Sequence, residues 1–366
     1  MTTTRVAVLG GSGFVGTRLL EKWMLGGTHE VRAIVRSPAS LARMARFALP
    51  DWAAADIFDA PALARAIEGC DAMVHAIVGD GAQIVAAAEA AVEACRLAGV
   101  RRLVYLSSAS VHGQNPPPGT NDFSALRDDH PSEYNNAKVR AERVLRDASA
   151  AGVEICMLRP GIVYGPRCQW FVGMPRALRS GQAFLVEGGE GFCNHIYVDN
   201  LIHAIELGLT HARATEGPFY VADDTCLSWR EFYRPVANAL GFDVSDFRAV
   251  PAAGTPPRTL KDRVHWAKQV GASKLILPMF SRRLKDAVKA GLDRYTAPPA
   301  ASGFVLPQAP VPAADWEISQ LHTCATRLPM NRAVEVLGYA PPVSAAEGLD
   351  RSARWLAGLW VPGPSP

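Results

Sequence analysis

The sequence lacks three features that would place the protein in a special class. No apolar run reaches the roughly 18 residues that a membrane-spanning helix needs. The seven cysteines include no Cys-x-x-Cys pair, which argues against a disulfide framework or a zinc site and favours reduced, buried thiols. The opening MTTT runs straight into an apolar strand pattern, without the basic and then apolar residues of a leader peptide. We therefore expect no metal and a cytoplasmic location.

A strong charge bias is missing as well. The formal net charge of +3 at pH 7 is too small for a protein that binds nucleic acid through a basic face. Hydrophobic residues make up 49% of the chain and charged residues 20%, which is ordinary for a globular enzyme. Because 366 residues exceed the usual size of a single core, we expect one large domain with a satellite, or two interleaved domains.

Short apolar runs alternate with helical patterns over the first 160 residues. Runs such as RVAVLG, EVRAIVR, DAMVHAIV, RRLVYLSS and VEICMLRP are typical of buried strands, and helical apolar spacing separates them. This alternation predicts an α/β fold with a doubly wound parallel Rossmann sheet. We expect the cofactor-binding Rossmann domain to cover 1–165, with 194–225 returning to it. A smaller, partly interleaved substrate-binding region would comprise 166–193 and 226–366.

A glycine-rich loop follows the first predicted strand. It reads Gly10, Gly11, Ser12, Gly13, Phe14, Val15 and Gly16, and it leads into an amphipathic segment. Glycines at such positions allow a tight turn, close approach of a pyrophosphate and close helix packing, and the helix N-terminus offers free N–H groups to phosphates. A glycine trio alone also fits a simple tight turn. Between a strand and a helix at the start of a βαβ unit, it predicts dinucleotide binding.

The residues after the second and third strands bear on which dinucleotide binds. NAD sites usually place an acid at the end of the second strand, whereas an arginine there accommodates the 2′-phosphate of NADP. This strand ends at Val35 and is followed by Arg36, which favours NADP, with NAD as the alternative cofactor. A solvated surface charge is the other interpretation of Arg36. Asp56 and Ile57 are candidate adenine contacts, although an Asp after a strand is as often a helix cap.

Hydroxyl groups and a lysine are predicted to meet at the carboxyl end of the sheet. Ser107 and Ser108 end the fifth strand, and Tyr134 precedes Lys138 by four residues, so the latter two share one face of a helix. A nearby ammonium stabilises a phenolate and lowers the pKa of a tyrosine. The pattern predicts that Tyr134 exchanges a proton with a carbonyl or alcohol while Ser108 holds the same oxygen. Alone, a Tyr and Lys four apart would be a common surface pair.

Together these motifs resemble the extended short-chain dehydrogenases/reductases, the NAD-dependent epimerase/dehydratase family. The resemblance runs from the glycine loop through YLSSASVHG, YNNAK, LRPGIVYGP and NHIYVDNLIHAI to MNRAVEVLGYAPPVSAAEGL. VRAIVRSP and VDNL are most similar to the dihydroflavonol-reductase and 3β-hydroxysteroid-dehydrogenase branches. The resemblance implies Ser108 as the carbonyl-orienting hydroxyl, Tyr134 as acid/base, Lys138 as its partner, and a homodimer. Further cofactor contacts are expected at His75, Ala76, Ser107, Pro160 and Gly161.

The chain departs from the family pattern at several positions. His112 stands where the family often has Tyr, and Asn194 where it often has Arg; we expect His112 to pack rather than to act as a second acid. Sugar-nucleotide dehydratases of the family carry an acidic pair where this chain has Ala109 and Ser110. Dehydration is therefore disfavoured.

These observations predict an NADP-dependent dehydrogenase or reductase. The reaction would be reversible hydride transfer between NADP(H) and a secondary alcohol or ketone of a medium or large apolar substrate. A nucleotide-sugar epimerase with a retained cofactor is the second enzymatic interpretation, and a non-catalytic NADP-binding regulator is a third.

One segment has an unusual local charge. Residues 258–294 contain ten Lys or Arg against three Asp, within a basic region of 254–294, and a Pro- and Ala-rich loop of 296–314 follows. We expect this segment to be a lid that meets an anionic substrate or a membrane surface, or else a solvated helical face.

Overall fold

A computed structural model describes residues 4–45, 49, 51–150, 152–254 and 312–359. The chain divides into two compact units, Met1–Ala253 with Pro312–Pro366, and Gly254–Val311. Everything below concerns the first unit. The predictions for the basic segment 258–294 fall outside the described residues, as does nearly all of the loop 296–314.

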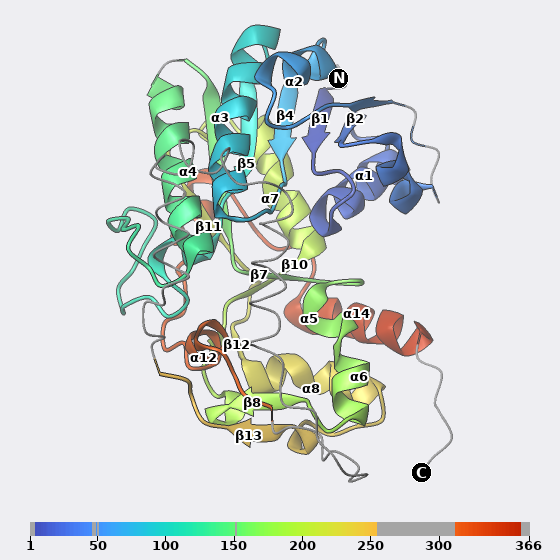
Figure 1. Cartoon of the computed structure of the whole chain (residues 1–366), viewed down its shortest axis with the longest axis vertical. Helices are drawn as coiled ribbons and strands as arrows, with labels where there is room; N and C mark the ends of the chain where they lie inside the picture. The colour runs from blue at the N-terminus through green and yellow to red at the C-terminus, as the bar shows by residue number, and fades with distance from the viewer. Residues whose placement is uncertain (1–3, 46–48, 50, 151, 255–311, 360–366) are drawn as a thin grey trace, which may run out of the picture. The chain divides into compact units, whose positions relative to one another are not determined.

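Seven parallel strands form the central sheet (Figure 1). Their order is β11-β6-β5-β4-β1-β2-β3, and every neighbouring pair is parallel. The strands are β1 (Arg5–Leu9), β2 (Glu30–Val35), β3 (Trp52–Ala54), β4 (Ala72–His75), β5 (Arg102–Leu106), β6 (Glu154–Pro160) and β11 (Phe219–Val221). The order reverses between β1 and β4, which is the point where such sheets bind ligands at the carboxyl ends of the strands. The predicted doubly wound Rossmann fold is confirmed.

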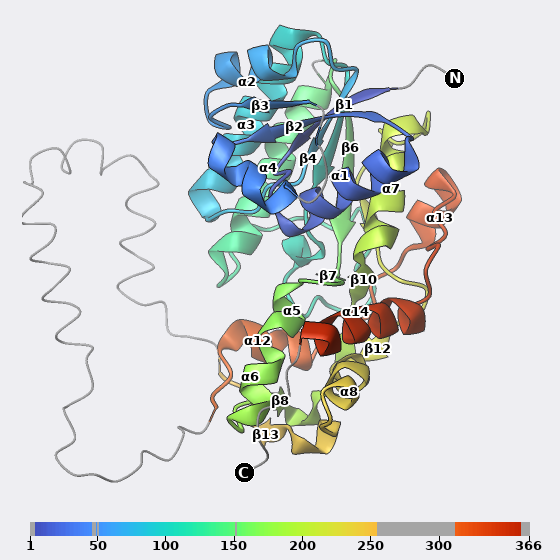
Figure 2. The same ribbon diagram turned by 90° about the vertical axis from the view of Figure 1, so that its right-hand side faces the viewer.

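Alternate residues of each strand face opposite layers of helices. Val6 and Val8 of β1 belong to the core that contains buried residues of α1 (Phe14–Gly26) and α7 (Val198–Thr210). Ala7 and Leu9 belong to the core formed with α2 (Ala60–Ile67), α3 (Gly81–Ala98) and α4 (Glu133–Ala150). Figure 2 shows these two layers on either side of the sheet. Burial on both faces explains why the strands read as continuous apolar runs.

A third core lies beyond the sheet. It is rich in aromatic residues, including Tyr164, Phe171, Trp229 and Phe232. Its helices are α5 (Gln169–Val172), α6 (Met174–Arg179), α8 (Trp229–Ala239), α12 (Trp316–His322) and α14 (Ala345–Leu359), while α13 (Asn331–Leu337) packs near β11. Its strands form three pairs, β10 (His195–Tyr197) with β7 (Ile162–Tyr164), β12 (Leu227–Ser228) with β9 (Phe192–Cys193), and β13 (Arg248–Val250) with β8 (Phe184–Val186).

Short 3₁₀ helices connect several of these elements. They are η1 (Pro38–Met44), η2 (Ala109–His112), η3 (Glu187–Gly189) and η4 (Val244–Asp246).

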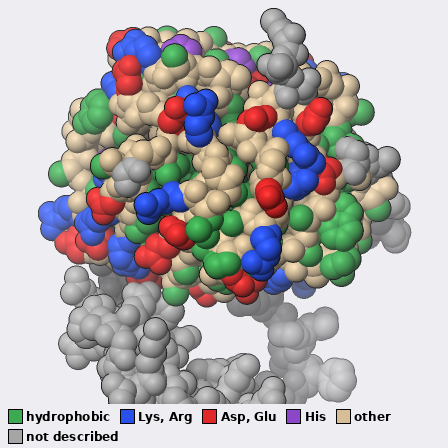
Figure 3. Space-filling model, turned by 90° about the horizontal axis from the view of Figure 1, so that it is seen from above, with side chains coloured by type: hydrophobic (Ala, Val, Ile, Leu, Met, Phe, Trp, Pro, Cys, Tyr) green, Lys and Arg blue, Asp and Glu red, His purple; other side chains and the backbone are tan. Residues whose placement is uncertain are grey.

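Charged side chains of both signs are interspersed on the face shown in Figure 3. Ion pairs between described residues include Arg5 with Asp51 and Arg102 with Glu154. Among the described residues no helix has the length and apolar content needed to cross a bilayer. All seven cysteines are free thiols. Six of them are buried, and Cys226 is half-buried.

Candidate active site

The glycine loop forms a close-packed turn between β1 and α1. Gly10 has a φ of 84° and accepts a hydrogen bond from the Gly13 N–H at 2.9 Å. A Cβ at Gly16 would lie 2.2 Å from the Gly10 oxygen, and one at Gly10 would lie 2.8 Å from the Ala76 oxygen. Helix α1 has Gly13 at its N-cap without a side-chain cap, so its first N–H groups are available to an anion.

Two arginines lie beside this loop. Arg36 follows β2 directly and is exposed. Arg43, in η1, donates from Nη1 to the main-chain oxygen of Ser12 at 3.3 Å. The sequence prediction included Arg36 and missed Arg43, because nothing in the pattern around residue 43 places it against the glycine loop.

The two candidate adenine contacts lie just beyond β3. Asp56 is exposed and accepts a hydrogen bond from the Phe58 N–H at 3.0 Å, and Ile57 is half-buried. The helix that follows is capped by Asp59 rather than Asp56. Asp56 therefore stabilises a turn and does not cap the helix.

The candidate cofactor contacts at the ends of β4 and β6 could reach a cofactor mainly through their backbone atoms. His75 is buried, its ring lies 4.8 Å from that of Tyr105, and its side chain is covered by protein. A cofactor contact from His75 would therefore be made by its main chain, as for Ala76. Gly161, after Pro160, has no room for a side chain, since a Cβ would lie 2.0 Å from the Asn194 oxygen.

Ser107 and Ser108 have different environments. Ser107 is buried, and its Oγ donates to Glu142 Oε1 at 2.6 Å. Ser108 is half-buried, and its Oγ lies 2.9 Å from Ser110 Oγ and accepts a hydrogen bond from the Ser110 N–H at 3.2 Å. Only Ser108 is placed to offer its hydroxyl to a substrate.

Tyr134 lies in the first turn of α4, beside Ser108. Burial raises the pKa of Tyr134 above its usual value, and a hydrogen bond with Ser108 acts in the opposite direction. The structure thus brings together the two hydroxyl groups that the sequence predicted to share a substrate oxygen.

Lys138 lies one turn further along α4 and is buried. Its Nζ donates to the Leu106 oxygen at 2.8 Å, and it lies 5.0 Å from the centroid of the Tyr105 ring and 5.9 Å from that of Tyr134. Burial lowers the pKa of Lys138 to about 8, opposed by the charge of Glu142. The lysine is therefore held close to the tyrosine by a main-chain contact.

One expectation about this pair is wrong. Lys138 was predicted to lower the pKa of Tyr134, but the pKa of Tyr134 is raised. The reason is that burial of the tyrosine penalises its phenolate, and this effect exceeds that of the hydrogen bond with Ser108. Tyr134 consequently carries its proton at neutral pH.

A buried ion pair supports this part of α4. Glu142 accepts two hydrogen bonds from Arg159, at 2.8 and 2.7 Å, and both side chains are fully buried. Arg159 Nη1 also donates to the Asp122 oxygen at 2.8 Å. The sequence prediction missed this pair, although a charged residue within the apolar run of β6 was a signal that a partner must exist.

Two positions that depart from the family pattern have structural contacts. His112 donates from Nε2 to the Ser124 oxygen at 2.9 Å, and its Nδ1 contacts the hydroxyl of Tyr220. Both ring nitrogens are occupied, in agreement with the expectation that His112 packs. Asn194 binds the Thr326 oxygen and the Leu328 N–H, at 3.0 and 2.9 Å.

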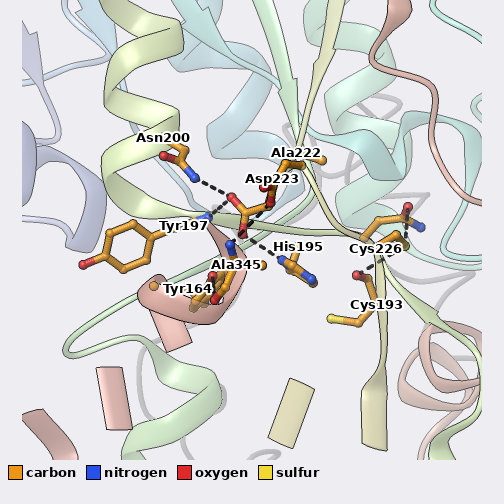
Figure 4. A network of polar contacts seen from close by, with 12 residues as sticks. Tyr164, Cys193, His195, Tyr197, Asn200, Ala222, Asp223, Cys226 and Ala345 are labelled. Atoms are coloured by element: carbon orange, nitrogen blue, oxygen red, sulfur yellow. Dashed lines mark hydrogen bonds and ion pairs between the residues drawn. The ribbon is translucent and has the colours of Figure 1, made fainter. Parts of the chain in front are cut away.

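A second polar network fixes the end of β10 (Figure 4). The buried carboxylate of Asp223 accepts hydrogen bonds from Tyr197 N at 2.8 Å and Asn200 Nδ2 at 2.7 Å, and lies 2.9 Å from His195 Nδ1. Asn200 in turn exchanges two hydrogen bonds with the backbone of Val343, at 2.7 and 3.0 Å. This network ties the segment after β10 to the C-terminal helix region.

The described residues fit a dinucleotide. The glycine loop has no side chains that would block a pyrophosphate, the start of α1 offers N–H groups, and Arg36 and Arg43 flank the position at the end of β2 where a ribose phosphate would lie. Ser108, Tyr134 and Lys138 place two hydroxyl groups and a buried amine near the carboxyl end of β5.

Comparisons with known proteins support this picture. The model of the 3-beta hydroxysteroid dehydrogenase/isomerase family matches residues 7–251. A 3 beta-hydroxysteroid dehydrogenase/Delta 5→4-isomerase of Mycobacterium tuberculosis is 31% identical over 262 residues, which is 65% of this chain and 70% of that protein. A 2-alkyl-3-oxoalkanoate reductase of Stenotrophomonas maltophilia is 28% identical over 254 residues, 65% of this chain and 76% of the reductase.

Solved structures share the fold at lower identity. The dTDP-glucose 4,6-dehydratase DesIV of Streptomyces venezuelae, solved with NAD bound, has a TM-score of 0.68 and 21% identity and covers 98% of this chain and 99% of its own. The predicted resemblance to the extended short-chain dehydrogenases/reductases is thereby confirmed, and this family contains oxidoreductases, epimerases and dehydratases. Within it, the chain belongs to the 3-beta hydroxysteroid dehydrogenase/isomerase family.

Proposed function

We propose that this protein is an NADP-dependent oxidoreductase that interconverts a ketone and a secondary alcohol on a medium-sized or large apolar substrate. The observation that carries the proposal is the grouping of Ser108, Tyr134 and Lys138 at the carboxyl end of β5, next to a glycine loop without obstructing side chains. The match to the hydroxysteroid dehydrogenase family and the likeness to a 2-alkyl-3-oxoalkanoate reductase support a carbonyl or alcohol substrate.

The chain's own residues would act on the substrate oxygen. Ser108 Oγ donates a hydrogen bond to the ketone, and the neutral Tyr134 hydroxyl gives up its proton to the developing alkoxide. The nearby charge of Lys138 stabilises the phenolate that remains. When bound, NADPH supplies the hydride. In the reverse direction Tyr134 accepts the proton from the alcohol.

Two further hypotheses belong to this proposal. Residues 166–193 and 226–366 would form the substrate-binding region, whose described part includes Phe171 and Phe232 of the aromatic core. The protein would act as a homodimer through α3 and α4. These two helices pack against each other within one chain and would together face the second copy.

The alternative is a nucleotide-sugar epimerase that keeps its cofactor bound. DesIV and a UDP-glucuronic acid 4-epimerase of Bacillus cereus are sugar-nucleotide enzymes, but they are only 21% and 15% identical to this chain. Their likeness to this chain concerns the fold alone. Consumption of NADPH distinguishes the two functions, because an epimerase has no net turnover of cofactor. Purified protein would be mixed with NADPH and a panel of steroid ketones, 3-oxoalkanoates and nucleotide sugars, and absorbance at 340 nm followed. Epimerisation of a nucleotide sugar without NADPH consumption would overturn the proposal.

The first prediction concerns the choice of cofactor. We expect the wild-type protein to bind NADPH about ten- to a hundredfold more tightly than NADH, because a charge-assisted contact to the 2′-phosphate contributes roughly 1.5 to 3 kcal/mol. Arg36→Ala and Arg43→Ala should each weaken NADPH binding and leave NADH binding nearly unchanged. Titration of both cofactors by fluorescence measures this.

Arg96→Ala is a matched control, since Arg96 is exposed in the last turn of α3 and pairs only weakly with Glu93. Equal affinity of the wild type for the two cofactors would show that NADP is not preferred. A loss of NADH binding as large as that of NADPH in the Arg36 variant would show that the arginine does not act on the 2′-phosphate.

A further inference from the structure

One buried carboxylate lies behind the candidate catalytic residues. Glu142 follows Lys138 by one turn of α4, and its side chain is fully buried. Its Oε1 accepts hydrogen bonds from Ser107 Oγ at 2.6 Å and from Arg159 Nε at 2.8 Å. Its Oε2 accepts from Arg159 Nη2 at 2.7 Å and from Arg146 Nη2 at 2.9 Å. The arginines balance the charge of the carboxylate, whereas the bond from Ser107 joins it to the end of β5.

Ser107 belongs to the short segment that carries groups of the candidate site. It stands between Leu106, whose main-chain oxygen accepts a hydrogen bond from Lys138 Nζ at 2.8 Å, and Ser108. The Ser107 side chain is buried, so losing its acceptor would leave a hydroxyl group unpaired in the interior. The hydrogen bond to Glu142 therefore fixes residues 106–108 against α4.

Glu142 also acts on Lys138 through its charge. Burial lowers the pKa of Lys138 to about 8, and the charge of Glu142 opposes this effect, because an opposite charge favours the charged form. Burial would raise the pKa of Glu142 itself, but the hydrogen bonds from Arg159 and Ser107 outweigh burial and hold this pKa below its usual value. The carboxylate is therefore ionised throughout the pH range in which Lys138 titrates.

We propose that Glu142 is a positioning residue for the reaction, whose carboxylate fixes residues 106–108 against α4 and keeps Lys138 in the ammonium form. It acts through Ser107 and Lys138 rather than on the substrate itself. The inference rests on the proposed function, in which the charge of Lys138 stabilises the phenolate of Tyr134. Without the carboxylate, Lys138 would lose its proton at a lower pH, and ketone reduction would stop at a lower pH as well.

The pH profile of kcat for ketone reduction by NADPH tests this role. The wild-type rate should fall as the pH rises through about 8, where Lys138 loses its charge. In Glu142→Gln the midpoint of this fall should move to lower pH by about one unit or more, the usual effect of losing a nearby opposite charge. Glu154→Gln is the matched control, because it removes an exposed carboxylate that pairs with Arg102, and it should leave the midpoint unchanged. The same midpoint in Glu142→Gln and wild type would overturn the proposal.

Two further variants separate this role from a loss of the fold. Glu142→Gln leaves the charge of Arg159 buried without a carboxylate, whereas Glu142→Met combined with Arg159→Met leaves no lone charge. Circular dichroism compares the folds, and the midpoint of the double variant should also move to lower pH. Ser107→Ala removes one hydrogen bond and keeps the carboxylate. It should lower kcat about tenfold, because small misplacements of catalytic groups are costly, and leave the midpoint in place. A wild-type kcat in Ser107→Ala would overturn the part assigned to this hydrogen bond.

A measurement without substrate distinguishes failure of this inference from failure of the proposed function. Lysine labelled with carbon-13 at Cε reports the charge of each amine by NMR, and Lys138→Met identifies the signal of Lys138. This signal should titrate near pH 8 in the wild type and at lower pH in both Glu142 variants. If the shift were observed and no ketone were reduced, the proposed function would fail while the control of the Lys138 charge would stand. Identical titration of Lys138 in the wild type and both variants would overturn the inference, whatever the reaction.

Discussion

Tyr134→Phe is expected to lose turnover by about a hundredfold or more while NADPH binding stays within about twofold of the wild-type value. The substitution removes only the hydroxyl that exchanges a proton with the substrate, and a positioned acid/base contributes about 10²–10⁴-fold to a rate. The aromatic ring, which packs against the core on the α4 side of the sheet, is retained. Steady-state rates of NADPH oxidation and a cofactor titration measure the two quantities separately.

Tyr339→Phe provides the control for this experiment. Its hydroxyl donates to the Ala222 oxygen at 3.0 Å, outside the group of Ser108, Tyr134 and Lys138, so its loss should leave the rate unchanged. If the Tyr134→Phe protein turned over at nearly the wild-type rate, another group would have to be the proton donor.

The largest expected effect on stability comes from the buried pair of Glu142 and Arg159. Arg159→Met should lower the free energy of unfolding by about 3–5 kcal/mol, because it leaves the carboxylate of Glu142 buried without its two charge-assisted hydrogen bonds from Arg159. Urea denaturation followed by circular dichroism measures the loss.

Arg146 provides a matched comparison at the same carboxylate. It binds Glu142 Oε2 at 2.9 Å, but its side chain is 41% exposed, so Arg146→Met should cost less than about 1 kcal/mol. The double variant of Arg159→Met and Glu142→Met should recover much of the loss, since no lone charge remains. If Arg159→Met and Arg146→Met had the same free energy of unfolding, the pair of Glu142 and Arg159 would not be a buried pair that is protected from screening by solvent.

The sheet and the cofactor loop could be predicted from local sequence pattern. Strands such as RVAVLG are buried on both faces and therefore read as apolar runs, and the conformation of the glycine loop depends on residues that are adjacent in the sequence. Tyr134 and Lys138 could be paired because one helix sets their separation. In each case the information lies within a short stretch of chain.

Features that depend on distant contacts could not be predicted in this way. Arg43 contacts Ser12, 31 positions away, and Asn194 binds Thr326, 132 positions away. The pKa of Tyr134 was predicted in the wrong direction because burial of its hydroxyl raises the pKa. The spacing of Tyr134 and Lys138 along one helix carries no information about how deeply the rest of the fold buries the tyrosine.

The two hydrogen bonds between Asn200 and Val343 have a consequence for the order in which the chain can fold during synthesis. The partners are 143 positions apart, and at about 5–20 residues per second the ribosome needs on the order of 10 s to make the intervening chain. Until then the amide of Asn200, which is fully buried in the finished protein, has no Val343 to bind. The nascent chain can assemble its parallel sheet early, but the segment after β10 must wait until Val343 has emerged. A truncation before Val343 would therefore deprive an interior polar group of its partner.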